Sequence, residues 1–172
     1  MKKIYILLLL LCSNLFLAQN INFTTNTNFK TALLAANTNN TIAKDVNLNP
    51  MKIDLDNDSE ISEIEALAVY HLDISLSNLI TNSISNISEI SNFTNLETLK
   101  CNKHQLISLN VSMLSNLKKL VANKNQLTSV LLPINSDPIL PNKLEYLSLE
   151  KNLLTSINLT NLPLRYVFLG QN

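Results

Sequence analysis

The fold is decided by the stretch NLETLKCNKHQLISLN (residues 95–110), whose pattern recurs three more times toward the C-terminus. The later copies are NLKKLVANKNQLTSV (116–130), NKLEYLSLEKNLLTSIN (142–158) and LRYVFLGQN (164–172). Each copy carries Leu-x-x-Leu-x-apolar-x-x-Asn, with His in place of Asn in the first copy and Val167 in place of the second Leu in the last copy. Self-similarity of this kind predicts a stack of similar structural units.

The spacing inside each copy predicts a short strand followed by a return path. The first leucines of the copies fall at 96, 117, 144 and 164, so the steps are 21, 27 and 20 residues. Residues two apart, such as Leu120 and Ala122, point to the same side of a strand, while the residues between them face outward. Because one copy cannot bury its apolar face alone, neighbouring copies must stack.

These lengths and this pattern resemble the leucine-rich repeat family over residues 69–172. The string Asn-Gln-Leu-Thr-Ser at 125–129 is similar to repeats of secreted bacterial members with an internalin-like outline. The resemblance implies a repeat solenoid with a short parallel sheet on its concave face and an irregular or 3-10 return path. It also implies binding of other macromolecules through the concave face, although a fold alone does not fix a function.

The ninth position of each copy has a predicted mechanical role. The amide of Asn125, Asn152 or Asn172 can satisfy backbone groups where the chain turns inward. His104 takes this place in the first copy, and we interpret it as a structural substitution. Cys101 occupies an inward strand position, so we expect a small buried hydrophobe there.

One earlier coil is predicted at residues 69–76, where Leu72 and Ile74 form the inward pair of a strand. The apolar residues between this strand and the next recur three apart, which suits a tight helical or ribbon-like return path. They are Ile84, Ile87, Ile90, Phe93 and Leu96. Together with the later copies, this coil gives about five strands in one parallel sheet.

Residues 1–18 are typical of a secretory signal peptide. Lys2 and Lys3 precede an apolar run over 4–11, and Ala18 offers a small residue for cleavage. Cys12 leaves lipoprotein processing as an alternative. The apolar run is too short to span a bilayer, so we expect an exported protein, secreted or on the cell surface, without a transmembrane span.

Residues 19–68 are expected to form an N-terminal cap, with a small helix over 28–36 and an acidic loop over 54–65. The loop resembles an EF-hand calcium loop, with oxygen-bearing side chains at the positions that bind the ion. The ligands implied by this resemblance are Asp54, Asp56, Asp58, Glu60, Ser62 and Glu65.

One residue departs from the EF-hand pattern. Ser59 fills the sixth position, where Gly normally makes the sharp turn, and a positive φ there costs on the order of 1 kcal/mol. A solvated acidic turn, with Ser62 or Asp58 capping the next helix, remains an alternative. If calcium binds, its expected role is structural, because the loop joins the cap to the first strand.

The outward strand positions supply the candidate ligand-binding face. Basic charge gathers near its middle and aromatic surface near its end, and exposed aromatics are common anchors in binding. The residues that we assign to this face are Tyr70, Lys100, Lys119, Tyr146, Tyr166 and Phe168. An ordinary solvated sheet surface is the alternative, since cross-strand aromatic pairs also stabilise a sheet.

Composition narrows the function classes. The net charge is +0 with 15% charged residues, which argues against nucleic-acid binding, and the single glycine excludes glycine-rich phosphate cradles. His71 and His104 fall on different coils with no nucleophile beside them, so we expect no enzyme. We predict a monomeric binding or adhesion module for an unknown protein or glycan, with a structural spacer as the alternative.

The last copy stops at its ninth position, before a return path. Terminal repeats ordinarily need a polar cap. We therefore expect the chain to be a fragment of a longer protein.

Overall fold

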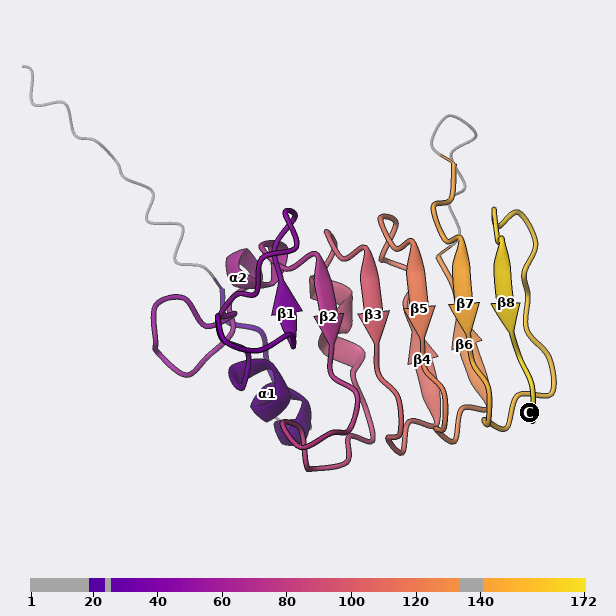
Figure 1. Cartoon of the computed structure of the whole chain (residues 1–172), viewed down its shortest axis with the longest axis horizontal. Coiled ribbons are helices and arrows are strands. Elements are labelled where there is room, and N and C mark those ends of the chain that lie inside the picture. The colour runs from indigo at the N-terminus through magenta and orange to yellow at the C-terminus, as the bar shows by residue number, and fades with distance from the viewer. Residues whose placement is uncertain (1–18, 24–25, 134–140) are drawn as a thin grey trace, which may run out of the picture.

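The computed structural model describes residues 19–23, 26–133 and 141–172, so the expected signal peptide lies outside the described residues. A six-stranded sheet runs along the described part in the order β1-β2-β3-β5-β7-β8 (Figure 1). Its strands are β1 (Ala43–Lys44), β2 (His71–Asp73), β3 (Thr98–Lys100), β5 (Lys119–Val121), β7 (Tyr146–Ser148) and β8 (Tyr166–Phe168). The sequence order of the strands follows their spatial order, as expected for stacked copies (Figure 1).

Five of these strands are parallel, which confirms the predicted number. Their registers align the central residue of each copy, so that Leu72, Leu99, Leu120, Leu147 and Val167 form one row across the sheet. The four leucines of this row are fully buried or nearly so. The row is therefore the inward face of the sheet, and its neighbours in each strand point outward.

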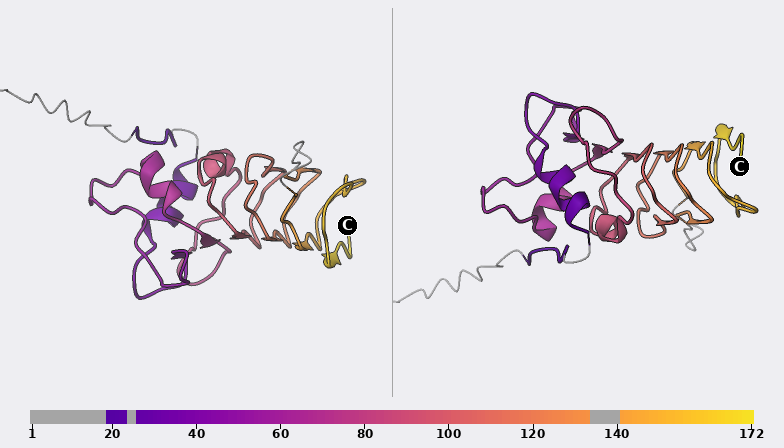
Figure 2. Two further views of the ribbon diagram at one scale, coloured as in Figure 1. Left: turned by 90° about the horizontal axis from the view of Figure 1, so that it is seen from above. Right: turned by 90° about the horizontal axis from the view of Figure 1, so that it is seen from below.

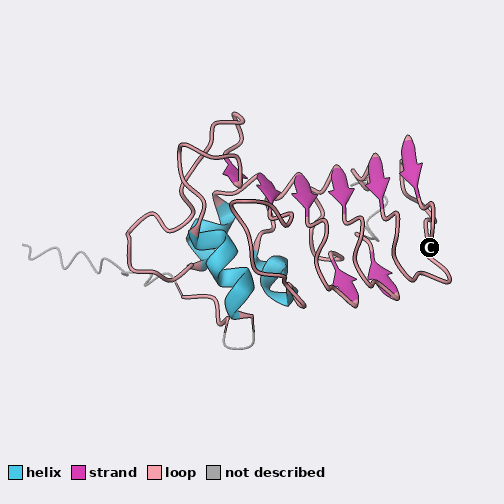
Figure 3. Ribbon diagram, turned by 60° about the horizontal axis from the view of Figure 1, so that its bottom comes forward, coloured by secondary structure: helices cyan, strands magenta, loops and turns pink. Residues whose placement is uncertain are grey.

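The return path contains structure of two kinds. A 3-10 helix, η1 (Ser88–Asn92), forms where the apolar residues recur three apart, and it confirms the predicted tight path. In the next two coils, β4 (Ser108–Asn110) and β6 (Ser129–Leu131) pair in parallel as a second, two-stranded sheet. Figure 3 shows these two strands as a separate row opposite the larger sheet. This second sheet was not predicted from the sequence.

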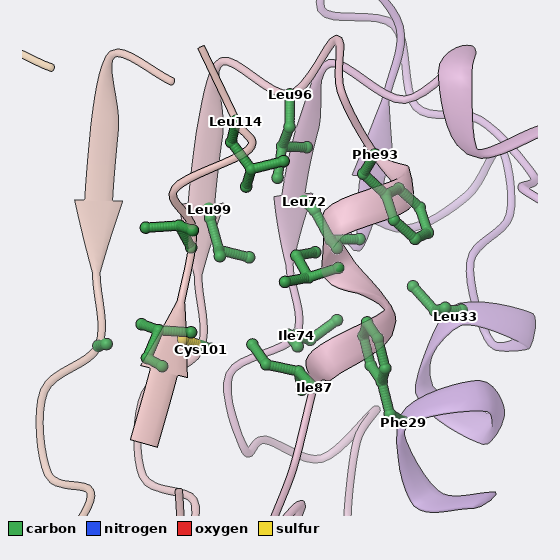
Figure 4. Close-up of a cluster of buried hydrophobic side chains, with 14 of the residues drawn as sticks. Phe29, Leu33, Leu72, Ile74, Ile87, Phe93, Leu96, Leu99, Cys101 and Leu114 are labelled. Atoms are coloured by element: carbon green, nitrogen blue, oxygen red, sulfur yellow. The ribbon is translucent and has the colours of Figure 1, made fainter. Parts of the chain in front are cut away.

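The N-terminal cap is built on α1 (Thr27–Leu34), close to the expected 28–36. Phe29 and Leu33 lie one turn apart on the buried side of α1, and Figure 4 shows them facing Ile87 and Phe93 of the first return path. The side chain of Asn26 donates to both Ser88 Oγ and Glu89 Oε2, which ties the start of α1 to η1. Seen from above and below, the helices gather at the N-terminal end of the stack (Figure 2).

The sheet is mixed, which corrects the purely parallel sheet of the sequence prediction. β1 pairs with β2 antiparallel, with Ala43 opposite Leu72 and Lys44 opposite His71. The turn that follows β1 is closed by Asp45, whose Oδ1 accepts the backbone N–H groups of Asn47 and Asn49. β1 thus covers the edge of β2, and an exposed edge would invite pairing with another chain.

Buried side chains at the ninth position join neighbouring coils. Asn125 Nδ2 donates to Cys101 O of the preceding coil at 2.9 Å and to Ala122 O of its own coil at 3.1 Å. Its Oδ1 accepts the N–H of Leu106 on the preceding return path at 3.3 Å. Asn152 repeats this pattern one coil later. Each of these amides therefore satisfies groups that would otherwise be buried without a partner.

His104 performs the same task in the first copy. Its Nδ1 accepts the N–H of Ile84 at 3.3 Å, and its Nε2 lies 2.6 Å from Ile74 O. Because Ile74 O is an acceptor, Nε2 carries the proton and His104 is the neutral Nε2–H tautomer. Burial lowers the pKa of His104, and the bond to Ile74 opposes this shift only in part. The predicted structural role of His104 is confirmed.

Cys101 is also placed as expected. It is fully buried in the inward position equivalent to Ala122, and burial raises the pKa of its thiol to about 12. A thiol with such a pKa is a small hydrophobe at neutral pH.

The last coil differs from the interior ones. Val167 is 42% exposed, whereas its equivalent Leu147 is fully buried. Its neighbours Tyr166 and Phe168 are exposed as well. Apolar surface that is covered between coils elsewhere in the stack is open here.

We predict that Asn125→Ala lowers the free energy of unfolding by about 2–4 kcal/mol, because it removes the bonds that satisfy Cys101 O and Leu106 N–H in the interior. Urea denaturation measures the change. Asn39→Ala is the matched control, since Asn39 is exposed. A loss below about 0.5 kcal/mol for Asn125→Ala would show that these bonds do not hold the coils together.

Protonation of His104 should destabilise the fold. Its pKa in the folded protein lies below the ordinary value near 6.5, so the unfolded chain binds more protons at mildly acidic pH. This loss of stability is absent above about pH 6.5 and grows as the pH falls below that value. We expect His104→Asn to lose less stability than the parent protein between about pH 7.5 and 5.5, as followed by urea midpoints. Equal losses in the two proteins would contradict this assignment.

Candidate functional site

The acidic loop brings three of the six predicted calcium ligands together. Asp54, Asp56 and Asp58 each place one carboxylate oxygen so that the three oxygens lie within 4.8 Å of one another. Calcium binds oxygens at about 2.3–2.6 Å, so one ion between these three groups can reach all of them. The alternate spacing of the aspartates therefore places these three carboxylates next to one another.

Asp54 is the most unusual member of this cluster. Only 6% of the residue is exposed, and its Oδ1 is buried without a hydrogen-bond partner. Its Oδ2 lies 3.4 Å from Lys52 Nζ, which compensates the charge in part. A buried carboxylate oxygen without a partner is costly, and a bound cation would satisfy it. The donor set, which consists of oxygens alone, suits a hard cation.

The loop around these aspartates is tightly wound. Asn57 and Ser59 both adopt a positive φ of 66°, so the expected left-handed conformation of Ser59 is confirmed. Asp56 Oδ1 accepts the N–H of Asp58, and Asp58 Oδ1 accepts the N–H of Glu60. These local bonds stabilise the turn. The left-handed conformation itself is unfavourable by about 1–2 kcal/mol for each residue that adopts it.

The other three predicted ligands make bonds with protein groups. Glu60 Oε1 lies 2.6 Å from Lys30 Nζ of α1. Ser62 is the N-cap of α2 (Glu63–Leu67), and Glu65 closes a capping box with it. Glu65 Oε1 also accepts the N–H of Leu55 at 2.6 Å, so both of its oxygens have donors. In this conformation Glu65 fastens the start of the loop to the helix that follows.

An aromatic cluster lies on the outward side of the sheet at β7 and β8. The ring centroids of Tyr146 and Tyr166 are 5.9 Å apart, and those of Tyr146 and Phe168 are 5.5 Å apart. Lys119 places its Nζ 4.2 Å from the centroid of the Tyr146 ring. Tyr166 is 58% exposed and Phe168 41%. The structure therefore brings together four of the six residues predicted for the binding face.

Two lysines on the outward side of the sheet form ion pairs with acidic residues of the preceding coil. Lys100 Nζ, predicted for the face, lies 3.2 Å from Asp73 Oδ2. Lys118 pairs with Glu97 at 2.8 Å in the adjacent column. Tyr70, the sixth predicted residue, is half-buried just before β2, where its backbone N–H donates to Lys44 O. Tyr70 and Lys100 are thus near the N-terminal end of the face, apart from the aromatic cluster.

β1 adds a residue to this face that sequence reasoning missed. Lys44 lies directly opposite His71 in the antiparallel pair and so shares the outward side of the sheet. The sequence does contain the spacing Asp45-x-Asn47-x-Asn49, which favours a local turn. This spacing does not indicate that the residues before the turn pair with β2.

Comparison with known proteins is informative about the fold. No family model matches the chain, and no curated protein matches it. A solved structure, the functional domain of InlJ from Listeria monocytogenes, matches with a TM-score of 0.52 and 24% sequence identity. The match covers 80% of this chain but only 27% of that chain. The likeness supports an internalin-like leucine-rich repeat fold.

One named feature of this internalin domain has no counterpart here. That domain is described as including a cysteine ladder. In this chain the described residues hold a single cysteine, Cys101, and its equivalents in the other coils are Ile74, Ala122, Leu149 and Leu169. Within the described ranges, no helix has the length and apolar character needed to cross a membrane.

Proposed function

We propose that this protein is a surface binding or adhesion module that recognises a macromolecule, a protein or a glycan, through the outward face of its sheet. The observation that carries this proposal is the exposed cluster of Tyr146, Tyr166 and Phe168. The internalin-like fold supports it, because the parallel strands of such a stack offer a broad surface built from regularly spaced side chains. Export by a signal peptide at 1–18 is part of the same proposal.

The chemistry of the cluster favours binding over a purely structural use. Tyr146 is half-buried between its neighbours, so its position is fixed, while Tyr166 and Phe168 remain open to solvent. Rigid aromatic side chains contribute large contact area with little loss of conformational entropy. Lys119, held against the Tyr146 ring, adds a donor for an acidic or polar ligand group at the border of the cluster.

A structural spacer is the second candidate. The same aromatic contacts stabilise adjacent strands by themselves, and β8 needs such stabilisation because its inward residue Val167 is partly exposed. A spacer has no ligand, so the two candidates differ in whether the face captures a partner. Catalysis remains unsupported, and we propose that the protein is not an enzyme.

The acidic loop is proposed as a structural calcium site of the cap. Asp54, Asp56 and Asp58 would hold the ion, and the unpartnered Asp54 Oδ1 supports this assignment. An ion there would remove the repulsion between the carboxylates and fix the loop that joins α1, through the Lys30–Glu60 pair, to α2. Glu65 would retain its place in the capping box or exchange it for the ion.

Binding by the face can be tested with glycan and protein arrays. We expect saturable capture of at least one arrayed ligand, and we expect the double variant Tyr146→Ala, Tyr166→Ala to weaken that binding at least about tenfold. Leu131→Ala is the matched control, since Leu131 is an equally exposed apolar residue on the second sheet. Undiminished binding by the double variant would remove the aromatic cluster from the account, and an absence of any ligand would favour the spacer.

Calcium should stabilise the protein through the aspartates. At a concentration about one hundred times its dissociation constant, calcium would add about 2.7 kcal/mol to the free energy of unfolding, seen as a higher melting temperature. We expect Asp54→Asn to abolish this increase and yet to be no less stable than the parent in chelator, because it removes a buried charge.

Glu63→Gln is the control for the calcium experiment. It removes one negative charge from an exposed position of α2 that the cluster does not include. A calcium effect that persists in Asp54→Asn, or that Glu63→Gln removes equally, would contradict the proposed site.

A further inference from the structure

A recess lies on the outward side of the sheet, at the opposite end from the aromatic cluster. It has a volume of about 310 Å³, at the lower end of the range typical of small-ligand sites. The turn after β1 forms one wall, and β2 and β3 form the floor. Figure 1 shows β1 and its turn beside β2 at this end of the sheet. The residues around it that the argument uses are Lys44, Leu48, His71, Asp73, Thr98 and Lys100.

Polar groups of this recess converge because of the strand register. His71 lies between Lys44 of β1 and Thr98 of β3, which are its direct partners on the two neighbouring strands. Among the residues that the structure describes, no ion pair involves Lys44. On the far side, Lys100 and Asp73 form an ion pair at 3.2 Å. The recess therefore offers a cationic donor, hydroxyl groups and one carboxylate acceptor.

Leu48 supplies an apolar wall. It is 59% exposed and adopts a positive φ of 67°, which is unfavourable for a bulky residue. The turn that places it is fixed by three hydrogen bonds to the Asp45 carboxylate. Local strain and exposure of an apolar side chain at the rim of a polar recess are typical of a site where a ligand packs.

We propose that this recess binds a carboxylate-bearing sugar unit, such as a uronate, of an acidic glycan. Lys44, with His71 beside it, receives the carboxylate. Thr98 and the Asp73–Lys100 pair exchange hydrogen bonds with ring hydroxyls, and Leu48 packs against the apolar C–H groups of the ring. The recess opens onto the sheet face, so that a longer glycan continues toward the outward residues of β5 and β7.

A peptide carboxylate is the less suitable ligand for two reasons. Proteins usually capture the C-terminus of a peptide with free backbone N–H groups, whereas the backbone of β2 and β3 is committed to the sheet ladder. The Asp73 carboxylate would also face the carbonyl-rich backbone of a peptide, but it accepts readily from a sugar hydroxyl.

His71 should make ligand binding by this recess depend on pH. Burial lowers its pKa, the charges of Lys44 and Lys118 act in the same direction, and Glu97 and Asp45 oppose them. His71 is therefore largely neutral at neutral pH in the free protein. A bound carboxylate favours the protonated ring, so binding of a uronate should tighten as the pH falls from about 7.5 to 5.5.

This inference rests on the proposed binding function and names a ligand class for it, but the two fail separately. The aromatic cluster is tested by variants of Tyr146 and Tyr166, and the recess by variants of Lys44 and His71. Loss of either set leaves the other set in place, because they lie at opposite ends of the sheet.

The experiment is an NMR titration of the isotope-labelled protein with three probes: glucuronate, glucose and acetate. We expect glucuronate to shift the amide signals of His71, Asp73 and Thr98, and to bind at least tenfold more tightly than either of the other two. We expect Lys44→Gln to weaken glucuronate binding at least tenfold and His71→Gln to remove its pH dependence. Arg165→Gln, which removes a positive charge from the exposed far end, should leave binding unchanged.

Three results would overturn the inference. Equal binding of glucose and glucuronate would show that no carboxylate is recognised, and tight glucuronate binding by the double variant Lys44→Gln, His71→Gln would place the site elsewhere. An acidic peptide that displaces glucuronate at a tenfold lower concentration would reassign the ligand class. Circular dichroism of each variant establishes that a loss of binding is not a loss of folding.

Discussion

The structure depends on the side chains at the ninth position of the first three copies, which are buried and bond to the coil that precedes them. Each coil consists largely of irregular backbone, and its strands are only three residues long, so the sheet ladder alone leaves many backbone groups unpaired. Asn125 and Asn152 pair these groups in the interior, and His104 does so at the first junction. Apolar burial between coils can follow because these side chains give partners to polar backbone groups that would otherwise be buried without one.

The two ends of the stack are covered to different degrees. At the N-terminal end, α1 packs Phe29 and Leu33 against the first return path, β1 covers the edge of β2, and Asn26 joins the helix to that path. At the other end, Val167 and the outer edge of β8 are open within the described residues. Because the coils hold the strands in register, the outward side chains form fixed columns, and both proposed ligand positions on the face are consequences of that register.

Much of the fold was predictable from the sequence because inward positions recur with a fixed spacing. Leu99, Leu120 and Leu147 were predictable as inward residues from the repeat pattern alone, and the positive φ of Ser59 was implied by the resemblance of the loop to an EF-hand. β1 was not predictable, because its partner lies 29 residues away at Leu72 and two residues carry no periodicity. The capping box that Glu65 forms with Ser62 was not predicted, because a carboxylate at that spacing suits both a cation and a capping box. The recess beside Lys44 depends on the same unpredicted strand.

The most direct test of this account is native-state hydrogen exchange of the backbone N–H groups that donate to the ninth-position side chains. The amides of Leu106 and Leu127 lie outside the regular strands and donate to Asn125 and Asn152. Since these bonds hold the coils together, we predict that both amides exchange as slowly as those of β5, through the same cooperative opening. If they exchange at the rates of exposed loop amides while β5 remains protected, the stack is held by its strands alone and the central claim is wrong.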